Sequence, residues 1–186
     1  MREFGHSSSG LAGSLLIAHP NLLDPNFKHT VLFIPVNNDD DGSFGLIINR
    51  PTGKKVKDFL PDQDLRDLAH VPVFIGGPVG NDQITFAAFE WKKDEDLVVC
   101  QTHLGIDEAW KLKDNETTSI RAFVGYAGWS KGQLESELDD KSWLVQRPDL
   151  DMMDLEKCSG LWQAIMKEQG PWFRLLASAP DDPSNN

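Results

Sequence analysis

The chain has 186 residues, which is long enough for one well-buried domain. Its composition, with 40% hydrophobic and 25% charged residues, is that of an ordinary soluble globular protein. The net charge of -11 opposes nonspecific attraction to DNA, RNA or anionic lipid, so nucleic-acid binding is disfavoured. No apolar run approaches the roughly 18 residues that span a bilayer, and we expect no membrane partner.

The ends of the chain differ in composition from its middle. We expect residues 1–10, which are rich in glycine and serine, to be a disordered tail or an added segment. Residues 178–186 are expected to be a loose C-terminal tail. Residues 11–177 are predicted to form a single α/β domain, alone or with a small second lobe. Cys100 and Cys158 are the only cysteines. Because no signal segment precedes them, reduced thiols in the cytosol are expected.

The clearest patterns along the chain are strands. Val31–Ile34, Leu46–Ile48 and Leu97–Cys100 are apolar on both faces, which predicts helices on both sides of a central sheet. Pro35 has no N–H group, so the end of its strand is expected at an edge or a bulge. In chain order, the predicted strands are Gly13–Ala18, Thr30–Val36, Phe44–Asn49, Val73–Gly76, Ile84–Phe89, Leu97–Thr102, Ser119–Tyr126 and Trp143–Val145.

Helical patterns alternate with these strands. In the last of them, Leu161, Trp162, Ile165 and Met166 form an apolar stripe that indicates a core position, and Gly170-Pro171 is expected to end the helix. Because pairs of nearby strands alternate with isolated helices, the sheet should be mixed rather than purely parallel. In chain order, the predicted helices are Val56–Leu60, Asp62–His70, Asp107–Lys113, Ser130–Asp140 and Ser159–Gln169.

Two short motifs follow strands. In Asn49-Arg50-Pro51, Pro51 should prevent the strand from continuing in a central ladder. The guanidinium of Arg50 could bind a carboxylate or phosphate; the alternative is a structural ion pair with Glu135 or Glu137. Gly76-Gly77-Pro78 could allow a ligand to approach the backbone, although a tight turn is the simpler interpretation. It is neither a P-loop nor a dinucleotide fingerprint.

The corner Gly125–Glu135 is the densest group of unusual residues. Its second half predicts a helix start, with Ser130 as N-cap, Gln133 at N3, and Trp129 packing on Leu134. Glycine at position 132 would then occupy N2, where it weakens a helix. That choice suggests that another segment, a partner or an anion lies against the backbone there.

The remaining residues give little indication of a catalytic thiol or of a metal site. Cys100 ends an apolar run and should be inert, whereas Cys158, near a helix start, is the more reactive candidate. His19, His29 and Asp24 would leave a metal site short of ligands. The acidic segment Asn37–Ser43 lacks the glutamate of a calcium loop. We expect neither a cofactor nor a bound metal.

Four ordered segments together resemble the AlgH/YqgE family of bacterial proteins, and the resemblance covers almost the whole chain. It implies a compact α/β sandwich with an irregular, branched sheet, a bacterial cytosolic location and no established biochemical activity. One name of the family comes from a link to transcriptional control of alginate production. The segments are Gly13–Pro20, Gly45–Pro51, Gly76–Val79 and Gly125–Glu135.

The leading functional hypothesis is a non-enzymatic binding or regulatory protein, which acts on an unknown protein or a small anionic ligand. One alternative is an enzyme with a thiol or carboxylate centre among Cys158, Glu135 and Glu137. Another is a transcriptional regulator, which the net charge disfavours. The binding surface should be built by strand ends and a helix N-terminus, with the residues Asn49, Arg50, Gly76, Gly77, Pro78, Tyr126, Trp129, Gly132, Gln133 and Glu135.

Overall fold

The computed structural model describes residues 10–38 and 42–178. Apart from Gly10 and Ser178, the two predicted tails lie outside this part, as do the three aspartates of the acidic segment, residues 39–41. Within the described residues, no helix has both the length and the apolar composition needed to cross a lipid bilayer.

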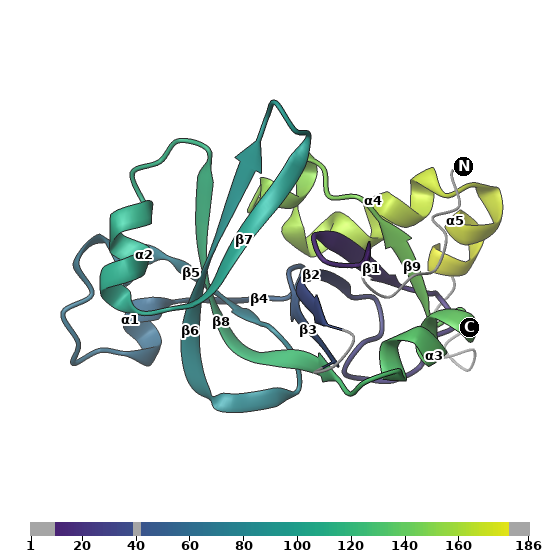
Figure 1. Cartoon of the computed structure of the whole chain (residues 1–186), viewed down its shortest axis with the longest axis horizontal. Coiled ribbons are helices and arrows are strands. Elements are labelled where there is room, and N and C mark those ends of the chain that lie inside the picture. Colours follow the sequence, from purple (N-terminus) through teal and green to yellow (C-terminus); the bar gives the residue numbers. More distant parts are fainter. Residues whose placement is uncertain (1–9, 39–41, 179–186) are drawn as a thin grey trace.

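The strands form one mixed, branched sheet (Figure 1). Among the strand pairs of residues 10–38 and 42–178, that of β5 with β8 is parallel and the others are antiparallel. The strands of the described residues are β1 (Ser14–Ala18), β2 (Val31–Asn38), β3 (Gly42–Ile47), β4 (Pro51–Lys55), β5 (Pro72–Ile75), β6 (Val79–Lys92), β7 (Leu97–Leu104), β8 (Thr118–Trp129) and β9 (Trp143–Gln146).

The branch lies in β8, which belongs to two sheets. Its first part, up to Val124, has β5 on one edge and β6 on the other. Its last residues, Ala127–Trp129, pair with β3 instead. We call β1, β2, β3, β9 and the end of β8 sheet A, and β4 to β7 with the start of β8 sheet B. The fold therefore has the mixed sheet that the sequence pattern predicts and the branched α/β sandwich that the resemblance implies.

Helices and short 3-10 turns (η) cover both sides of this sheet (Figure 1). The helical segments are α1 (Val56–Phe59), η2 (Arg66–His70), α2 (Ile106–Leu112), α3 (Gln133–Asp139), η3 (Leu150–Met153), η4 (Cys158–Gly160), α4 (Leu161–Glu168) and α5 (Pro171–Ser178). Successive residues of β5 enter different clusters: Phe74 joins the larger core, while Val73 joins a smaller one beneath α1, η2 and α2. The centre of sheet B is thus buried on both faces.

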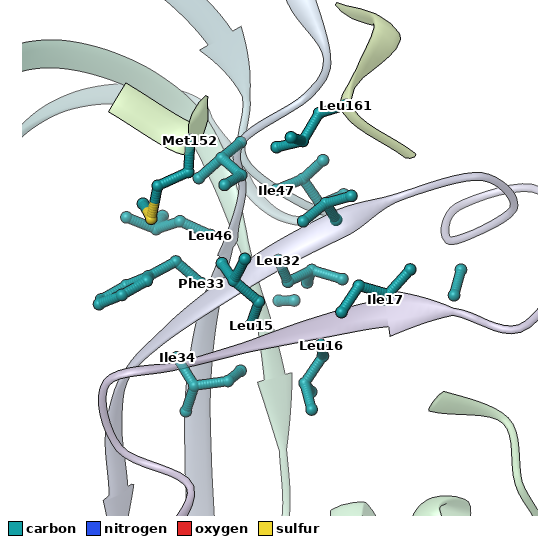
Figure 2. Packing of buried hydrophobic residues seen from close by; sticks show 14 of the residues in the cluster. Leu15, Leu16, Ile17, Leu32, Phe33, Ile34, Leu46, Ile47, Met152 and Leu161 are labelled. Carbon is teal, nitrogen blue, oxygen red and sulfur yellow. The ribbon is translucent and has the colours of Figure 1, made fainter. Parts of the chain in front are cut away.

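The larger core is built on sheet A. Figure 2 shows Leu15 and Ile17 of β1 directed towards Met152 and Leu161, whereas Leu16 points to the opposite side. The predicted stripe of α4 is confirmed as core, since its four apolar residues are buried. Burial on both faces explains why β1 and the start of β2 lack polar alternation.

Several boundaries differ from the predictions for physical reasons. The strand Leu97–Cys100 was expected to be covered on both faces, but Val99 is exposed because β7 is the outer strand of the β6–β7 hairpin. Asp62–His70 forms only a 3-10 turn, at its end. Pro51 opens a new strand, β4, and Pro171 opens α5 as well as ending α4. Of the edge or bulge expected at Pro35, the structure has the bulge, since the register of β2 against β3 shifts there, but β2 does not end at Pro35 and continues to Asn38.

Candidate functional site

The backbones of β5 and β8 meet without side chains between them at the branch. A Cβ on Gly76 would overlap the carbonyl oxygen of Gly125, and a Cβ on Gly77 would overlap the backbone of Tyr126. Glycine is therefore required for this close approach. The predicted turn at residues 76–78 is also the contact that lets β8 leave β5 and turn towards β3.

Hydrogen bonds join three strand ends at the same point. The N–H of Gly76 donates to the carbonyl of Val124 at 2.9 Å, and the N–H of Ile47 donates to the carbonyl of Gly76 at 2.8 Å. The N–H of Ile75 donates to the carbonyl of Arg50 at 3.0 Å. The segments around Arg50, Gly76 and Tyr126 are thus neighbours in space.

A surface of aromatic and aliphatic side chains lies beside this junction. Phe44 pairs with Val36 across β2 and β3, and its ring centroid is 5.2 Å from that of Tyr126. Val79 is the pairing partner of Tyr126 across β6 and β8. The ring of His103, on β7, lies 5.1 Å from the ring of Phe44. We call Val36, Phe44, Val79, His103 and Tyr126 the branch surface.

Local backbone features expose the branch surface. The register of β6 against β7 shifts between Phe86 and Ala88, and His103 adopts a positive φ of 57° at that bulge. Such a bulge redirects a side chain, and here the His103 ring reaches Phe44. Gly128, opposite Phe44 on β8, has no side chain to cover the edge of the Tyr126 ring. Val36 is 50% exposed and Val79 is 42% exposed.

Asn49 and Arg50 hold the loop between β1 and β2. The amide of Asn49 accepts from the N–H of Val31 at 2.8 Å and donates to the carbonyl of His29 at 2.9 Å. The Arg50 guanidinium donates to the carbonyls of Asn26 at 2.7 Å and Lys28 at 2.8 Å. The expected pair of Arg50 with Glu135 or Glu137 was wrong, because the guanidinium is aimed at backbone carbonyls instead.

The helix after β8 starts later than predicted. Its first residue is Gln133, and Gly132 is the N-cap with a φ of 76°. No atom of the described part of the chain would lie within 4 Å of a Cβ on Gly132, so the expected packing of another segment of this chain was wrong, while the approach of a partner or an anion stays a prediction. Glycine occurs here because this backbone conformation is left-handed. The Ser130 N–H still donates to Oε1 of Gln133 at 3.1 Å, and that half of the predicted capping box exists as a turn before the helix.

The corner around Trp129 is a structural junction. Oε2 of Glu137 accepts hydrogen bonds from the indole N–H groups of Trp129 at 2.9 Å and Trp143 at 2.8 Å. Gln133 donates to the other carboxylate oxygen of Glu137 at 3.0 Å. Phe27, in the loop that Arg50 holds, contacts both indole rings. These contacts join α3 to both ends of sheet A, and Glu137 has a packing role.

The predicted site residues thus divide into groups. Gly76, Gly77 and Tyr126 meet at the branch, and Pro78 follows them in the turn, where its carbonyl accepts from the Asn81 side chain at 3.1 Å. The side chains of Asn49 and Arg50 face the β1–β2 loop. Trp129 is buried, and Gly132, Gln133 and Glu135 belong to the start of α3.

No pattern in the sequence pointed to Val36, Phe44 or His103 as site residues. A phenylalanine or valine in a strand is ordinarily a core residue, and a bulge leaves no motif in one sequence. Val79 lay in the glycine motif but was not named as a site residue. The branch surface became visible only through the pairing of β3, β6 and β8.

Both thiols lie near an unusual arginine. Burial raises the pKa of Cys100 to about 12, and burial also raises the pKa of Cys158. Arg121 is fully buried between the rings of Phe74 and Phe89, and burial lowers its pKa to about 10. A high thiol pKa leaves little thiolate near neutral pH, which is unfavourable for a nucleophile.

His19 and His29, which were considered and set aside as metal ligands, make aromatic contacts. The His19 ring meets Phe173 edge-on, with centroids 5.6 Å apart, and the His29 ring lies 4.1 Å from that of Trp162. Burial lowers the pKa of His19. Across the described ranges, no group of three or more histidine, cysteine and acidic side chains is arranged to hold a metal ion.

The shared strand and its glycine junction define a small α/β protein with one branched, mixed sheet. The chain belongs to the AlgH-like family, whose model matches residues 15–174. It is 33% identical to a UPF0301 protein of Thermobifida fusca over 95% of this chain and 96% of that protein. A UPF0301 protein of Thioalkalivibrio sulfidiphilus is 35% identical over 92% of this chain and 96% of its own length.

Solved structures show the same fold. The solution structure of the AlgH protein from Pseudomonas aeruginosa matches with a TM-score of 0.62 and 27% identity, covering 98% of this chain and 100% of that chain. The crystal structure of protein DIP2367 from Corynebacterium diphtheriae matches with a TM-score of 0.65 and 18% identity. That match covers 96% of this chain and 95% of the other.

Proposed function

We propose that this protein is a non-enzymatic binding protein of the bacterial cytosol, and that its partner docks on the branch surface. The observation that carries the proposal is the gathering of Val36, Phe44, Val79, His103 and Tyr126 from five strands onto one exposed area. Aromatic residues beside exposed aliphatic ones are enriched at protein interfaces, where tyrosine is a frequent hot spot.

The backbone beneath the branch surface, as well as its residue composition, supports a role in binding. Its side chains stand on strands that glycines and backbone hydrogen bonds hold rigidly at the branch. A rigid surface loses little conformational entropy on binding, which favours affinity. The predicted residues Gly76, Gly77 and Tyr126 contribute to it, Gly76 and Gly77 as the base and Tyr126 as a contact.

The raised pKa values of the two thiols support binding over thiol catalysis. The carboxylate of Glu137, one of the two candidate carboxylates beside Glu135, already accepts three hydrogen bonds from neighbouring side chains. A group committed to packing in this way is poorly suited to act on a substrate.

Affinity capture from extract of the source bacterium tests the proposal. The immobilised chain is compared with Val36→Glu and Val79→Glu, which place a charge in the branch surface at half-exposed positions. Val99→Glu is the matched control, because Val99 is 39% exposed and lies on β7 outside the branch surface. Retained proteins and metabolites are quantified by mass spectrometry.

We expect a partner that the wild-type chain and Val99→Glu retain and that both branch-surface variants lose. A charge in an apolar interface costs several kcal/mol, which corresponds to at least about tenfold in affinity. The same retained set for all four proteins would contradict the proposal. Circular dichroism of each variant confirms that the fold is intact.

A further inference from the structure

A separate hollow lies on the other side of sheet B, between the end of α1, β6 and the start of α2. Its volume is about 320 Å³. This is near the lower end of the volumes of small-molecule sites, and it equals the volume of about ten water molecules in the liquid. The hollow does not include the branch surface, because Leu104 lines it whereas the neighbouring His103 is directed to Phe44.

The hollow has an apolar floor and a polar rim. Leu60, Ile84, Phe86, Leu104 and Ile106 supply apolar lining. This arrangement suits the hydrocarbon part of a small ligand, since burying apolar surface is worth about 25 cal/mol per Å². An open hollow of this size takes a molecule of about ten non-hydrogen atoms or fewer.

The rim carries polar groups that the fold does not use. Gln63, Asp82 and Gln83 are the polar residues with side-chain functional groups that line the hollow. Within the described ranges, these three side chains make no hydrogen bond or ion pair. A few convergent polar groups over an apolar floor are the usual composition of a ligand site.

The charge of the rim favours a positively charged ligand. Among the described residues that line the hollow, Asp82 alone is charged, and none is a lysine, arginine or histidine. The N–H of Gly105, which could have met an anion, already donates to Oε2 of Glu108 at 2.9 Å. The net charge of -11 adds a long-range field that attracts cations.

We propose that this hollow binds a small amphiphilic cation, with its apolar part on Leu60, Ile84 and Leu104 and its ammonium group at Asp82. The ligand class differs from the small anion expected from the sequence. That expectation rested on the Arg50 and Gly132 segments, whereas this inference rests on the lining of a different surface.

Three probes of similar shape test the sign of the charge: 2-phenylethylammonium, 2-phenylethanol and phenylacetate. Each is titrated into the isotope-labelled full chain, and amide chemical shifts are followed. We expect the ammonium probe to shift amides around the hollow and to bind about two- to fivefold more tightly than the alcohol, as for an exposed ion pair. Phenylacetate should bind most weakly.

Two variants with matched controls locate the binding. Asp82→Asn should remove the difference between the ammonium probe and the alcohol, whereas Asp94→Asn, on the β6–β7 turn, should preserve it. Gly105→Leu should weaken all three probes by filling the hollow. Gly160→Leu is its control, because both glycines are helix N-caps with negative φ, of −77° and −94°, and Gly160 lies elsewhere.

Three outcomes would overturn the inference. They are equal affinity for phenylacetate and the ammonium probe, unchanged affinity in Gly105→Leu, and no amide shift with any probe at millimolar concentration. Val36→Glu and Val79→Glu should leave probe binding unchanged, so failure at the hollow is distinguishable from failure at the branch surface.

Discussion

The positively charged guanidinium of Arg121 lies in the core, where it has few hydrogen-bond partners. Its Nη2 donates to the carbonyl of Met152, but Nε and Nη1 are buried and have no partner among the described residues. The rings of Phe74 and Phe89 lie 5.5 and 5.1 Å from the guanidinium carbon. Cation–π contacts offset only part of the desolvation cost of a buried charge.

We therefore expect Arg121→Met to raise the free energy of unfolding by about 1 kcal/mol. Replacing a poorly compensated buried charge by an apolar side chain of similar length often stabilises a protein, although the Met152 carbonyl then loses its donor. Urea denaturation measures the change. A loss of stability would show that Arg121 is better compensated than its contacts indicate.

The thiols give a second prediction at this scale. Because burial raises the pKa of both cysteines, iodoacetamide should label native Cys100 and Cys158 slowly near pH 7 and rapidly only after denaturation. Below the pKa of Cys100, about 12, its thiolate fraction should rise about tenfold per pH unit. Peptide mass spectrometry follows each site. Fast labelling of native Cys158 would instead support the thiol-enzyme alternative.

At the scale of elements, the attachment of α3 depends on one carboxylate. Trp129 and Trp143 are each only 4% exposed, and both donate to Glu137. Glu137→Ala should lower the free energy of unfolding by about 2–4 kcal/mol, because it leaves two buried indole N–H groups unsatisfied. Thermal unfolding followed by tryptophan fluorescence measures the loss.

Glu135→Ala is the matched control on the same helix, since Glu135 has no hydrogen bond or ion pair within the described part of the chain. It should change stability by less than about 0.5 kcal/mol. Similar losses in both variants would show that removing a carboxylate from α3, not the loss of the indole contacts, determines the effect.

The elements also show how far the sequence alone was informative. Apolar runs located most strands, and the stripe of α4 identified its buried face. The errors in helix boundaries came from proline and glycine, because each of these residues is compatible with more than one position at a helix end. Pro171 was taken as a stop although proline is also common at the first position of a helix. Gly132 was placed inside α3, because the sequence pattern does not reveal its left-handed backbone.

At the scale of the whole molecule, the glycine contact at the branch joins the two sheets. A Cβ on Gly76 would overlap the Gly125 carbonyl, so Gly76→Ala should lower the free energy of unfolding by about 3 kcal/mol. Hydrogen exchange should show loss of protection in both sheet A and sheet B, since both depend on β8.

Gly128→Ala is the control on β8, because its Cβ would meet the Tyr126 ring at an ordinary 3.4 Å and no other atom of the described residues within 4 Å. We expect a change within about 0.5 kcal/mol. Loss of protection confined to sheet B in Gly76→Ala would contradict the view that the branch couples the sheets.

The branch itself was expected from the resemblance, not from the residues. The sequence pattern of Thr118–Trp129 does not indicate that the first part of this strand pairs with β5 and β6 and its end with β3. Strand pairing between distant segments depends on the whole set of competing contacts, which one sequence does not display. The branch surface depends on that pairing and therefore could not be predicted from the sequence.

The late position of β8 in the chain has a consequence for biosynthesis. On the ribosome, the hairpins β2–β3 and β6–β7 emerge first and can form locally. Sheet B lacks its part of β8 until residue 124 has left the exit tunnel, and sheet A lacks its part until residue 129 has left. Until then the nascent chain displays unpaired apolar edges, the kind of surface that chaperones bind.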